Sequence, residues 1–339
     1  MSLENIWFFL VALLFTGYVV LDGFDLGAGV LYPFVARTED EKRVVRSSIG
    51  PVWDGNEVWL VTGGGALFAA FPMVYAMTFS GFYLAIMLVL FGLILRAVSL
   101  EFRHGDQSWS RVWDGAFFLG SLAPATLVGC ALGNVIRGVP MNANGDYTGT
   151  FLQLLNPYSL LVAVTGLFLI VTHGAAWLAL KSEGELHARA VQCRKITFWI
   201  FAVLAVATSA ATIATVSRAS DNVLGRPLGW FFLVVLALSL LYTISQMMKE
   251  GAELKSFLGS AVIIIALAGI AAVGNYPEIV PARGTPPDTS LTVTNSASGH
   301  LTLQVMLIIA IIGFPLALLY TAYVYRTFRG KTRAGDAEY

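Results

Sequence analysis

The chain of 339 residues is poor in charge, in histidine and in cysteine. Charged residues make up only 12% of it, about half the ~25% of soluble domains, and 21 Lys and Arg residues balance 21 Asp and Glu residues. A net charge of zero excludes the basic surface that attracts nucleic acid. Two cysteines, Cys130 and Cys193, are too few for a disulfide framework or a cysteine-rich metal site.

Hydrophobic residues, by contrast, make up 57% of the chain, and they come in long blocks without alternation. A helix needs about 20 mainly apolar residues to cross ~30 Å of hydrocarbon, whereas the strands of a membrane barrel are about 10 residues long and alternate. The sequence therefore predicts an all-α polytopic membrane protein with nine transmembrane helices. They lie near residues 6–34, 48–71, 77–100, 113–136, 157–180, 196–217, 228–247, 256–274 and 302–325.

The basic residues between these spans predict the orientation. If the N-terminus lies outside, all but four of the 21 Lys and Arg residues fall on the inner side or at the inner ends of spans, as the positive-inside rule requires. The four exceptions are Arg137, Arg218, Arg226 and Arg283. We therefore expect an outer N-terminus and a cytoplasmic C-terminus.

The whole chain, residues 1–339, is expected to form a single integral membrane domain. Its outer loops are predicted at residues 138–156 and 275–301, and a cytoplasmic tail at residues 326–339. Neither loop is long enough to be a catalytic domain. The start MSLENIWFF has no basic segment, so a cleaved signal peptide is not expected.

Five charged residues lie inside the first three predicted spans, where each costs at least ~2.5 kcal/mol and needs a reason. Asp22 and Asp25 are three apart in the first span, and Asp54 and Glu57 are three apart in the second, so each pair shares a helix face. Arg96 lies near the inner end of the third span. Helix rise places them all in roughly the inner half of the membrane, so Arg96 is predicted to pair with at least one carboxylate.

Two interpretations of this group stay open. The first is a buried ion-pair network that fixes helix packing, supported by the neighbours Trp53 and Asn56. The second is a path for protons or substrate, since four acids face one base. Gly23 and Gly27 flank Asp25 and would let another backbone approach closely.

Metal ligands are scarce within the spans. His173 is the one histidine clearly inside a span, and haem ligation by two histidines would need a second one. A packed or hydrogen-bonded histidine is the favoured interpretation, and no metal site is predicted.

Several motifs resemble subunit II of the cytochrome bd-type quinol oxidases, and the resemblance extends over essentially the whole chain. The run WDGNEVWL followed by GGALFAAFP is long and unusual. The motifs are DGFDLGAG (22–29), GPVWDGNEVWL (50–60), GGALFAAFP (64–72), FSGFYLAIMLVL (79–90), FLQLLNPYSLL and SLTVTNSASGHLTLQVM.

The resemblance implies a fold of two four-helix bundles plus a peripheral ninth helix. It implies a complex that oxidises membrane quinol and reduces O2 to water, using protons from the cytoplasm. Two haems b, one haem d and the quinol site are then expected on a partner, subunit I. Some family members bind a structural quinone in subunit II, and the sequence does not decide whether this chain does. Nor does it decide whether a small single-helix third subunit is present.

The resemblance also implies roles for single residues. A proton path is implied at Asp22, Asp25 and Asp54, while Glu57 stands where other members can have Gln. An O2 channel is implied near Trp59. The small residues that follow Trp59, Ala66 among them, could leave space for a tunnel, although a purely packing role for Trp59 stays open.

The alternative function, from another class, is a proton-coupled secondary transporter. Nine helices with buried acids and glycine breaks would suit it on composition alone. Transporters, however, usually have matched halves, whereas here the charged motifs gather in the first three spans.

Overall fold

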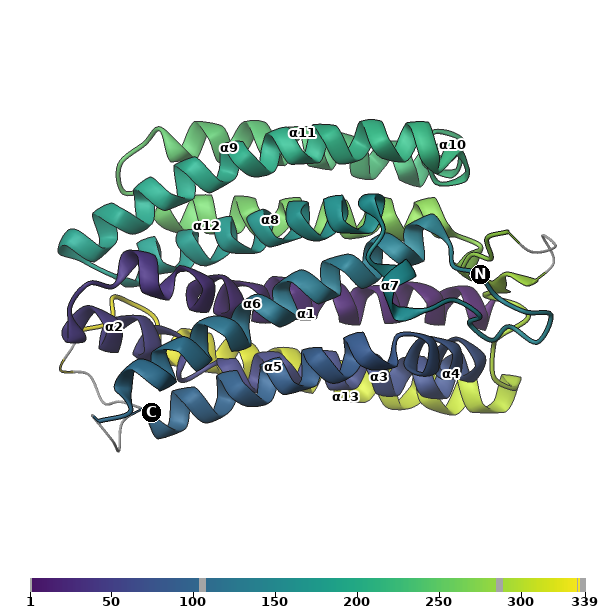
Figure 1. The fold of residues 1–339 in the computed structure, drawn as a ribbon, viewed down its shortest axis with the longest axis horizontal. Coiled ribbons are helices and arrows are strands. Elements are labelled where there is room, and N and C mark those ends of the chain that lie inside the picture. Colours follow the sequence, from purple (N-terminus) through teal and green to yellow (C-terminus); the bar gives the residue numbers. More distant parts are fainter. Residues whose placement is uncertain (1, 104–107, 285–288, 334, 336–339) are drawn as a thin grey trace.

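The protein is a bundle of long helices that run roughly parallel to one axis (Figure 1). The computed structural model describes residues 2–103, 108–284, 289–333 and 335. Its elements are α1 (Leu3–Val35), α2 (Glu39–Ile49), α3 (Trp53–Ala70), α4 (Pro72–Gly81), α5 (Tyr83–Phe102), α6 (Ser110–Arg137), α7 (Phe151–Leu154), α8 (Pro157–Lys181), α9 (Gly184–Thr215), α10 (Ser217–Leu224), α11 (Pro227–Met247), α12 (Glu253–Asn275), β1 (Glu278–Val280), β2 (Leu291–Thr292) and α13 (His300–Thr327).

Eight helices of the described residues are long and apolar enough to cross a membrane: α1, α5, α6, α8, α9, α11, α12 and α13. They correspond to eight of the nine predicted spans. The remaining predicted span, 48–71, corresponds to α3, which has 18 residues and contains Asp54 and Glu57. The structure thus bears out an all-helical polytopic protein and supports eight spans by length and composition.

The first two spans are joined by a helix that sequence analysis did not predict. The short polar helix α2 is amphipathic and has a capping box, in which Thr38 accepts from the backbone N–H of Glu41 and Glu41 accepts from that of Thr38. The Thr-x-x-Glu spacing was a readable signal for a helix start. A turn at Gly50–Val52 then separates α2 from α3, so the helix begins later than residue 48.

The third predicted span, 77–100, is also divided. α4 starts with Pro72 at its first turn, where a missing N–H costs nothing, and ends at Gly81. The chain bends at Phe82, and α5 begins at Tyr83. The apolar run continues across this bend, so composition alone did not reveal it.

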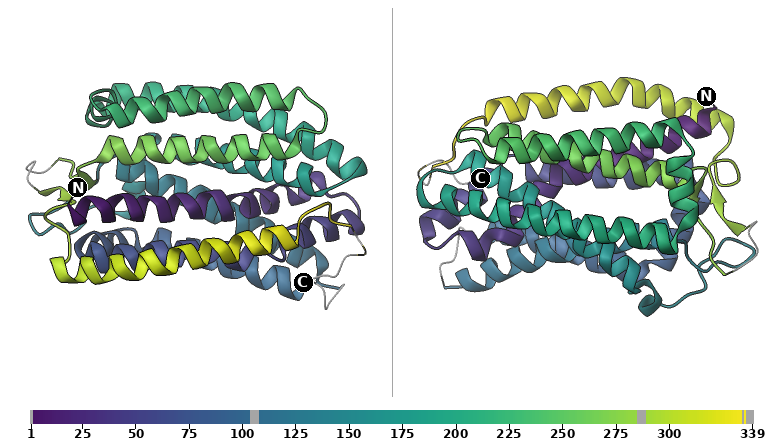
Figure 2. Two further views of the ribbon diagram at one scale, coloured as in Figure 1. Left: turned by 180° about the vertical axis from the view of Figure 1, so that it is seen from behind. Right: turned by 90° about the horizontal axis from the view of Figure 1, so that it is seen from above.

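The long helices pack in two groups. The first contains α1, α3, α5 and α6, and the second contains α8, α9, α11 and α12, with α1 and α6 contacting α8 between them. Helix α13 lies outside both groups against α1 and α3, and Leu303 is its one buried residue among those described. Figure 2 shows α13 along one side of the bundle.

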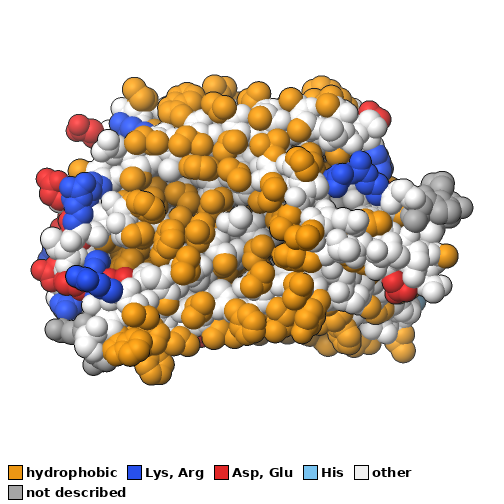
Figure 3. All heavy atoms as spheres, viewed as in Figure 1, with side chains coloured by type: hydrophobic (Ala, Val, Ile, Leu, Met, Phe, Trp, Pro, Cys, Tyr) orange, Lys and Arg blue, Asp and Glu red, His pale blue; other side chains and the backbone are white. Residues whose placement is uncertain are grey.

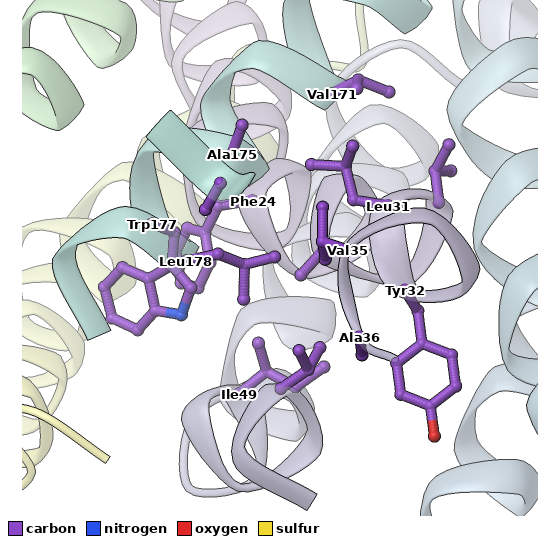
Figure 4. Close-up of a cluster of buried hydrophobic side chains, with 14 of the residues drawn as sticks. Phe24, Leu31, Tyr32, Val35, Ala36, Ile49, Val171, Ala175, Trp177 and Leu178 are labelled. Carbon is purple, nitrogen blue, oxygen red and sulfur yellow. The ribbon is translucent and has the colours of Figure 1, made fainter. Parts of the chain in front are cut away.

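Helix α1 lies at the centre, and the largest cluster of buried apolar side chains surrounds its second half. Phe24, Leu31 and Val35 of α1 pack there with Ile49 of α2 and Leu178 of α8 (Figure 4). The Phe24 ring stacks on that of Trp177 with their centroids 4.1 Å apart. This packing fixes the part of α1 that carries the two aspartates.

Glycines bring α1 and α8 into backbone contact. A methyl group added at Gly27 would collide with the carbonyl of Ile170 and with Gly174, and one added at Gly174 would collide with the backbone of Gly27. The close approach predicted for this part of α1 is confirmed at Gly27. The side of Gly23 is less crowded, since the nearest atom would be Ile170 Cγ1 at 3.8 Å.

The two loops predicted on the outer side pack on each other at one end of the bundle. Strands β1 and β2 form an antiparallel pair, and Val139 donates to the carbonyl of Pro281 at 3.0 Å. Ser298 also donates to the backbone carbonyls of Ala69 and Ala70 at 2.6 and 2.8 Å. These bonds satisfy backbone groups that the end of α3 leaves free.

The surface agrees with a membrane protein. Figure 3 shows hydrophobic side chains spread over the middle of the molecule, with Lys, Arg, Asp and Glu gathered toward the two ends. Exposed apolar residues include Val61, Val203 and Leu319, each more than 65% exposed. A face of this kind is stable in lipid or against another protein, and not in water.

We predict that Gly174→Ala destabilises the protein although alanine is the better helix former. The added methyl would push α1 and α8 apart, and overpacking of this kind costs typically ~1–3 kcal/mol. Gly166→Ala in the same helix is the matched control, because a methyl there would meet its nearest atom, Gly129 Cα, at 3.9 Å. The measurement is the thermal midpoint of the purified protein in detergent. Equal midpoints for the two variants would contradict the close-contact explanation.

Candidate functional site

Three of the four acids of the first three predicted spans, Asp22, Asp25 and Glu57, gather around one arginine. Arg96 of α5 is completely buried, and its Nη2 donates to Asp22 Oδ1 of α1 at 2.6 Å. The same nitrogen also pairs with Glu57 of α3, whose side chain is 22% exposed. The predicted pairing of Arg96 with a carboxylate is confirmed, and it ties three helices together.

Asp25 lies in the same buried group but has no cation of its own. It is completely buried, and its Oδ2 accepts from the Asn56 amide at 2.7 Å. The same amide nitrogen donates to the Leu21 carbonyl at 3.1 Å, and the Asn56 oxygen accepts from Tyr325 Oη at 3.0 Å. Asn56 therefore orients Asp25 and connects it to α13.

Some polar atoms of the group have no partner among the described residues. They are Asp22 Oδ2, Asp25 Oδ1, and Arg96 Nε and Nη1. An isolated buried charge or polar group is costly, so such atoms usually meet water or another group. With three carboxylates around one guanidinium, the arrangement has more acid than a simple ion pair requires.

Asp54 occupies a different place from the other acids. It is exposed, and it has no hydrogen bond or ion pair within the described chain. It shares one exposed face of α3 with Val58, Val61, Gly65 and Phe68, at helical spacing. The sequence placed Asp54 near the level of Asp25 and Arg96, and the structure turns its side chain away from them.

Trp53 and the residues expected near an O2 channel are packed among helices. Trp53 is half-buried against the apolar cluster of α1, α2 and α8. The Trp59 ring lies against Gly17 of α1 and meets the Phe314 ring of α13 at 5.6 Å in an edge-to-face contact. Ala66 is half-buried about two turns further along α3.

His173 is a packed histidine, as the sequence favoured. It is completely buried, its Nδ1 lies 2.7 Å from Ser260 Oγ, and its Nε2 lies 3.0 Å from the carbonyl oxygen of Val20. Its ring stacks on Phe257 with their centroids 4.6 Å apart. Both ring nitrogens are engaged, so His173 joins α8 to α1 and α12 and does not fit an axial ligand of haem.

A second charged network, which sequence analysis did not identify, lies where α2 meets α5 and α6. Asp114 accepts from Lys42 at 2.8 Å, from Arg103 at 2.9 Å and from the Tyr32 hydroxyl at 2.8 Å. Hydrogen bonding from Lys42 lowers the pKa of Glu39 on the same surface. The sequence did offer a signal for this network, because Asp114 is an acid at the inner end of a predicted span, opposite basic residues.

Tyr325 was also missed, and nothing local in the sequence singles it out. It lies 269 residues from Asn56, and only the position of α13 beside α3 brings them together. Asn56 itself could be found because it lies between two acids of one motif.

The helix bundle, its apolar belt and its buried ion-pair group define a multi-pass membrane protein. The family model "Cytochrome bd terminal oxidase subunit II" matches residues 3–328. The chain is 36% identical to "Cytochrome bd-I ubiquinol oxidase subunit 2" of Escherichia coli (strain K12), over 99% of this chain and 97% of that one. It is 34% identical to "Cytochrome bd ubiquinol oxidase subunit 2" of Bacillus subtilis (strain 168), over 97% and 96%.

The fold agrees with these matches. A chain from "The structure of bd oxidase from Geobacillus thermodenitrificans" superposes with a TM-score of 0.80 over 97% of this chain and 99% of that one, at 18% identity. This chain belongs to the cytochrome bd terminal oxidase subunit II family. It is thus a multi-pass membrane subunit of a bacterial respiratory oxidase, from a family whose complexes have haems. Membership also decides against the transporter interpretation.

We predict that Arg96→Gln strongly destabilises the protein and that Asp22→Asn restores part of the loss. The single change leaves the buried Asp22 carboxylate without its cation, which costs ~3–5 kcal/mol, whereas the double change removes both charges of that pair and leaves only the partly exposed Glu57 without its cation. The measurement is the thermal midpoint and yield of the purified complex. Arg111→Gln, at an exposed arginine near the start of α6, is the control. The ion-pair explanation fails if the double variant is no more stable than Arg96→Gln.

Proposed function

We propose that this chain is the non-haem subunit II of an oxidase that oxidises membrane quinol and reduces O2 to water. Its relatives in Escherichia coli and Bacillus subtilis are named as subunits of ubiquinol oxidases, which supports quinol as the electron donor. Two haems b, one haem d and the quinol site lie on subunit I in this proposal. The engagement of both nitrogens of His173 supports that division. The haems supply the redox chemistry, and this chain supplies packing, protons and access for O2.

We propose nine crossings with the N-terminus outside, counting α3 with α4 as the ninth. The start of α1 and the start of α13 lie together, since Trp7 donates to the carbonyl of Leu303 at 2.9 Å. Both helices then run to the opposite end of the bundle (Figures 1 and 2). An even number of crossings would not bring the end of α13 to the side opposite the start of α1. In this orientation the tail at residues 326–339 is cytoplasmic, and its residues 334 and 336–339 lie outside the described residues.

The exposed face of α3 supports a protein partner at this place. Asn56 contacts Asp25, which is ten residues before the end of α1, so Asn56 lies about 15 Å from that end along the axis of the bundle. Asp54 is exposed at nearly the same depth, where lipid would make a carboxylate costly. A face with Asp54, Gly65 and large apolar residues is better covered by subunit I than by lipid.

The observation that carries the proton role is the surplus of carboxylates around Arg96. Asp22 and Glu57 share its guanidinium, while Asp25 is held by a neutral amide and keeps an oxygen without a partner. In our proposal protons from the cytoplasm pass by Asp25, Asp22 and Glu57 and reach the partner through Asp54. Arg96, Asn56 and Trp53 position these acids and do not titrate.

The same helix supports a route for O2. O2 is apolar and needs a continuous path between apolar side chains. Trp59, packed between Gly17 and Phe314, borders the stretch in which a methyl at Gly64 or Gly65 would meet no atom within 4 Å. We propose that O2 moves along this small-residue stretch, past Ala66, toward the haem d of subunit I.

We predict that Asp54→Asn lowers oxidase turnover and proton uptake severely while the haem spectra and subunit assembly stay normal. The change keeps the size of the side chain and removes its titrating group, and no hydrogen bond or ion pair among the described residues is lost. Turnover with quinol and proton uptake by the reconstituted complex are the measurements. Asp221→Asn, at an exposed carboxylate of α10, is the matched control.

The alternatives for Asp54 give different results. Failure of the complex to assemble would assign Asp54 to the subunit contact, and normal turnover with normal assembly would reject both roles. The function itself is tested by the optical spectrum of the native complex. A preparation without haem d absorbance and without a second large subunit would contradict the proposed oxidase.

We predict that Ala66→Phe slows O2 binding to the reduced enzyme by about tenfold without changing the haem content. A ring at this half-buried position would fill the space beside the glycines, and tenfold corresponds to an added barrier of ~1.4 kcal/mol. Flash photolysis of the carbon monoxide complex in the presence of O2 measures the rate. Ala207→Phe, at an exposed position of α9, is the control. Unchanged rates of O2 binding in both variants would show that O2 does not move along this part of α3.

A further inference from the structure

A cavity of about 270 Å³ lies at the end of the bundle where α2, the end of α8 and the segment after α13 meet. Its volume is just below the range of about 300–1,000 Å³ that ligand pockets have, so it suits a small ligand with water. The segment Phe328–Thr332 forms one wall. Thr332 holds this segment against α8 by donating to the carbonyl of Lys181 at 2.7 Å.

The described side chains that line the cavity include three cations and no Asp or Glu. The cations are Lys181, Arg329 and Lys331. The Nζ of Lys181 is 2.5 Å from the carbonyl oxygen of Phe328, and that of Lys331 is 3.1 and 2.9 Å from the carbonyl oxygens of Ala179 and Ser182. Neither lysine has a carboxylate partner among the described residues. Carbonyl groups solvate these ammonium groups but do not neutralise them.

Of the three cations that line the cavity, Lys181 is the one for which a missing counter-ion is most costly. Its residue is only 7% exposed, and its Nζ lies 5.0 Å from the centre of the Trp177 ring. A buried charge without a counter-ion is costly, and contact with an aromatic face offsets only part of that cost. An anion in the cavity would supply the missing charge.

Two residues that line the cavity each have a buried donor atom without a partner. Ser47 Oγ and Trp177 Nε1 are buried and have no hydrogen-bond partner in the described chain, and these residues are 8% and 4% exposed. Buried polar groups are nearly always paired, so an unpaired hydroxyl and an unpaired indole N–H beside a lysine indicate an acceptor that belongs in the cavity. Cations together with neutral donors are the set that binds phosphate oxygens.

We propose that this cavity binds a phosphate group, either that of an anionic phospholipid or free inorganic phosphate. Lys181 supplies the charge, Ser47 and Trp177 donate to phosphate oxygens, and Lys331 and Arg329 close the site from the segment after α13. The site lies at the end of α8 and α13, at the level of lipid headgroups. Its wall also contains Tyr325, whose hydroxyl donates to Asn56, so occupancy is connected to the residue that orients Asp25.

The test uses the purified oxidase complex, delipidated in a phosphate-free neutral detergent. It is titrated separately with inorganic phosphate and with dihexanoyl phosphatidylglycerol, and binding is read from the thermal midpoint and from native mass spectra. We expect one saturable site. Lys181→Met should raise its Kd roughly tenfold or more, and Ser47→Ala about threefold, because each removes one donor to the anion. Lys249→Gln, at an exposed lysine outside the cavity, should leave the Kd unchanged.

The source of the phosphate follows from the two titrations. Binding of phosphatidylglycerol alone assigns a lipid headgroup, and binding of both ligands assigns the phosphate group itself. The proposal is overturned if neither ligand binds, or if Lys181→Met, Ser47→Ala and Lys249→Gln bind equally well. It is also overturned if binding appears only after residues 336–339 are deleted, since Asp336 and Glu338 would then be the natural occupants. Ser47→Ala is the decisive variant, because Ser47 Oγ makes no hydrogen bond in the described chain whose loss could disturb the fold.

Discussion

A guanidinium buried in a membrane must be neutralised by groups that other helices bring to it, and this requirement organises the first half of the chain. Arg96 of α5 contacts Asp22 of α1 and Glu57 of α3. These three helices must therefore place their charged side chains at the same depth, and each helix must be rotated about its axis so that this side chain faces the other two. Helix α3 contains Asp54, Asn56 and Glu57, and among the long helices of the described residues it is the one whose composition is not apolar enough for a membrane span.

The position of α1 makes this arrangement possible. Its second half contacts α8 so closely that only glycine fits at Gly27 and Gly174, and its aromatic side chains pack against α8 and α2. The two aspartates of α1 are thereby held in the interior of the bundle, completely buried. A carboxylate there cannot turn to water, so its protonation depends on the few groups that face it: Arg96, Asn56 and the neighbouring acids.

The acids of one sequence motif end up with different surroundings, and this difference suits a subunit that works through a partner. Glu57 faces inward to Arg96, while Asp54, three residues earlier, lies on the exposed face of α3. Helix α3 thus connects the buried group around Arg96 to the exposed surface of the protein. In the function that we propose, the haems lie on subunit I, and this chain contributes by delivering the protons that O2 reduction consumes, by admitting O2 and by stabilising the complex.

Sequence alone determined the class of the protein, the approximate spans, most residues of the buried group and the family, because hydrophobic block length, rare intramembrane charges and motifs are local properties. It even predicted that Arg96 would pair with an acid, since an unpaired charge at that depth is too costly. Only the tertiary structure decided which acid pairs with it, because Asp54 and Glu57 differ by helix rotation, which depends on packing. It also decided the contact of Tyr325 with Asn56 and the cavity around Lys181, since both are formed by segments more than a hundred residues apart in the sequence.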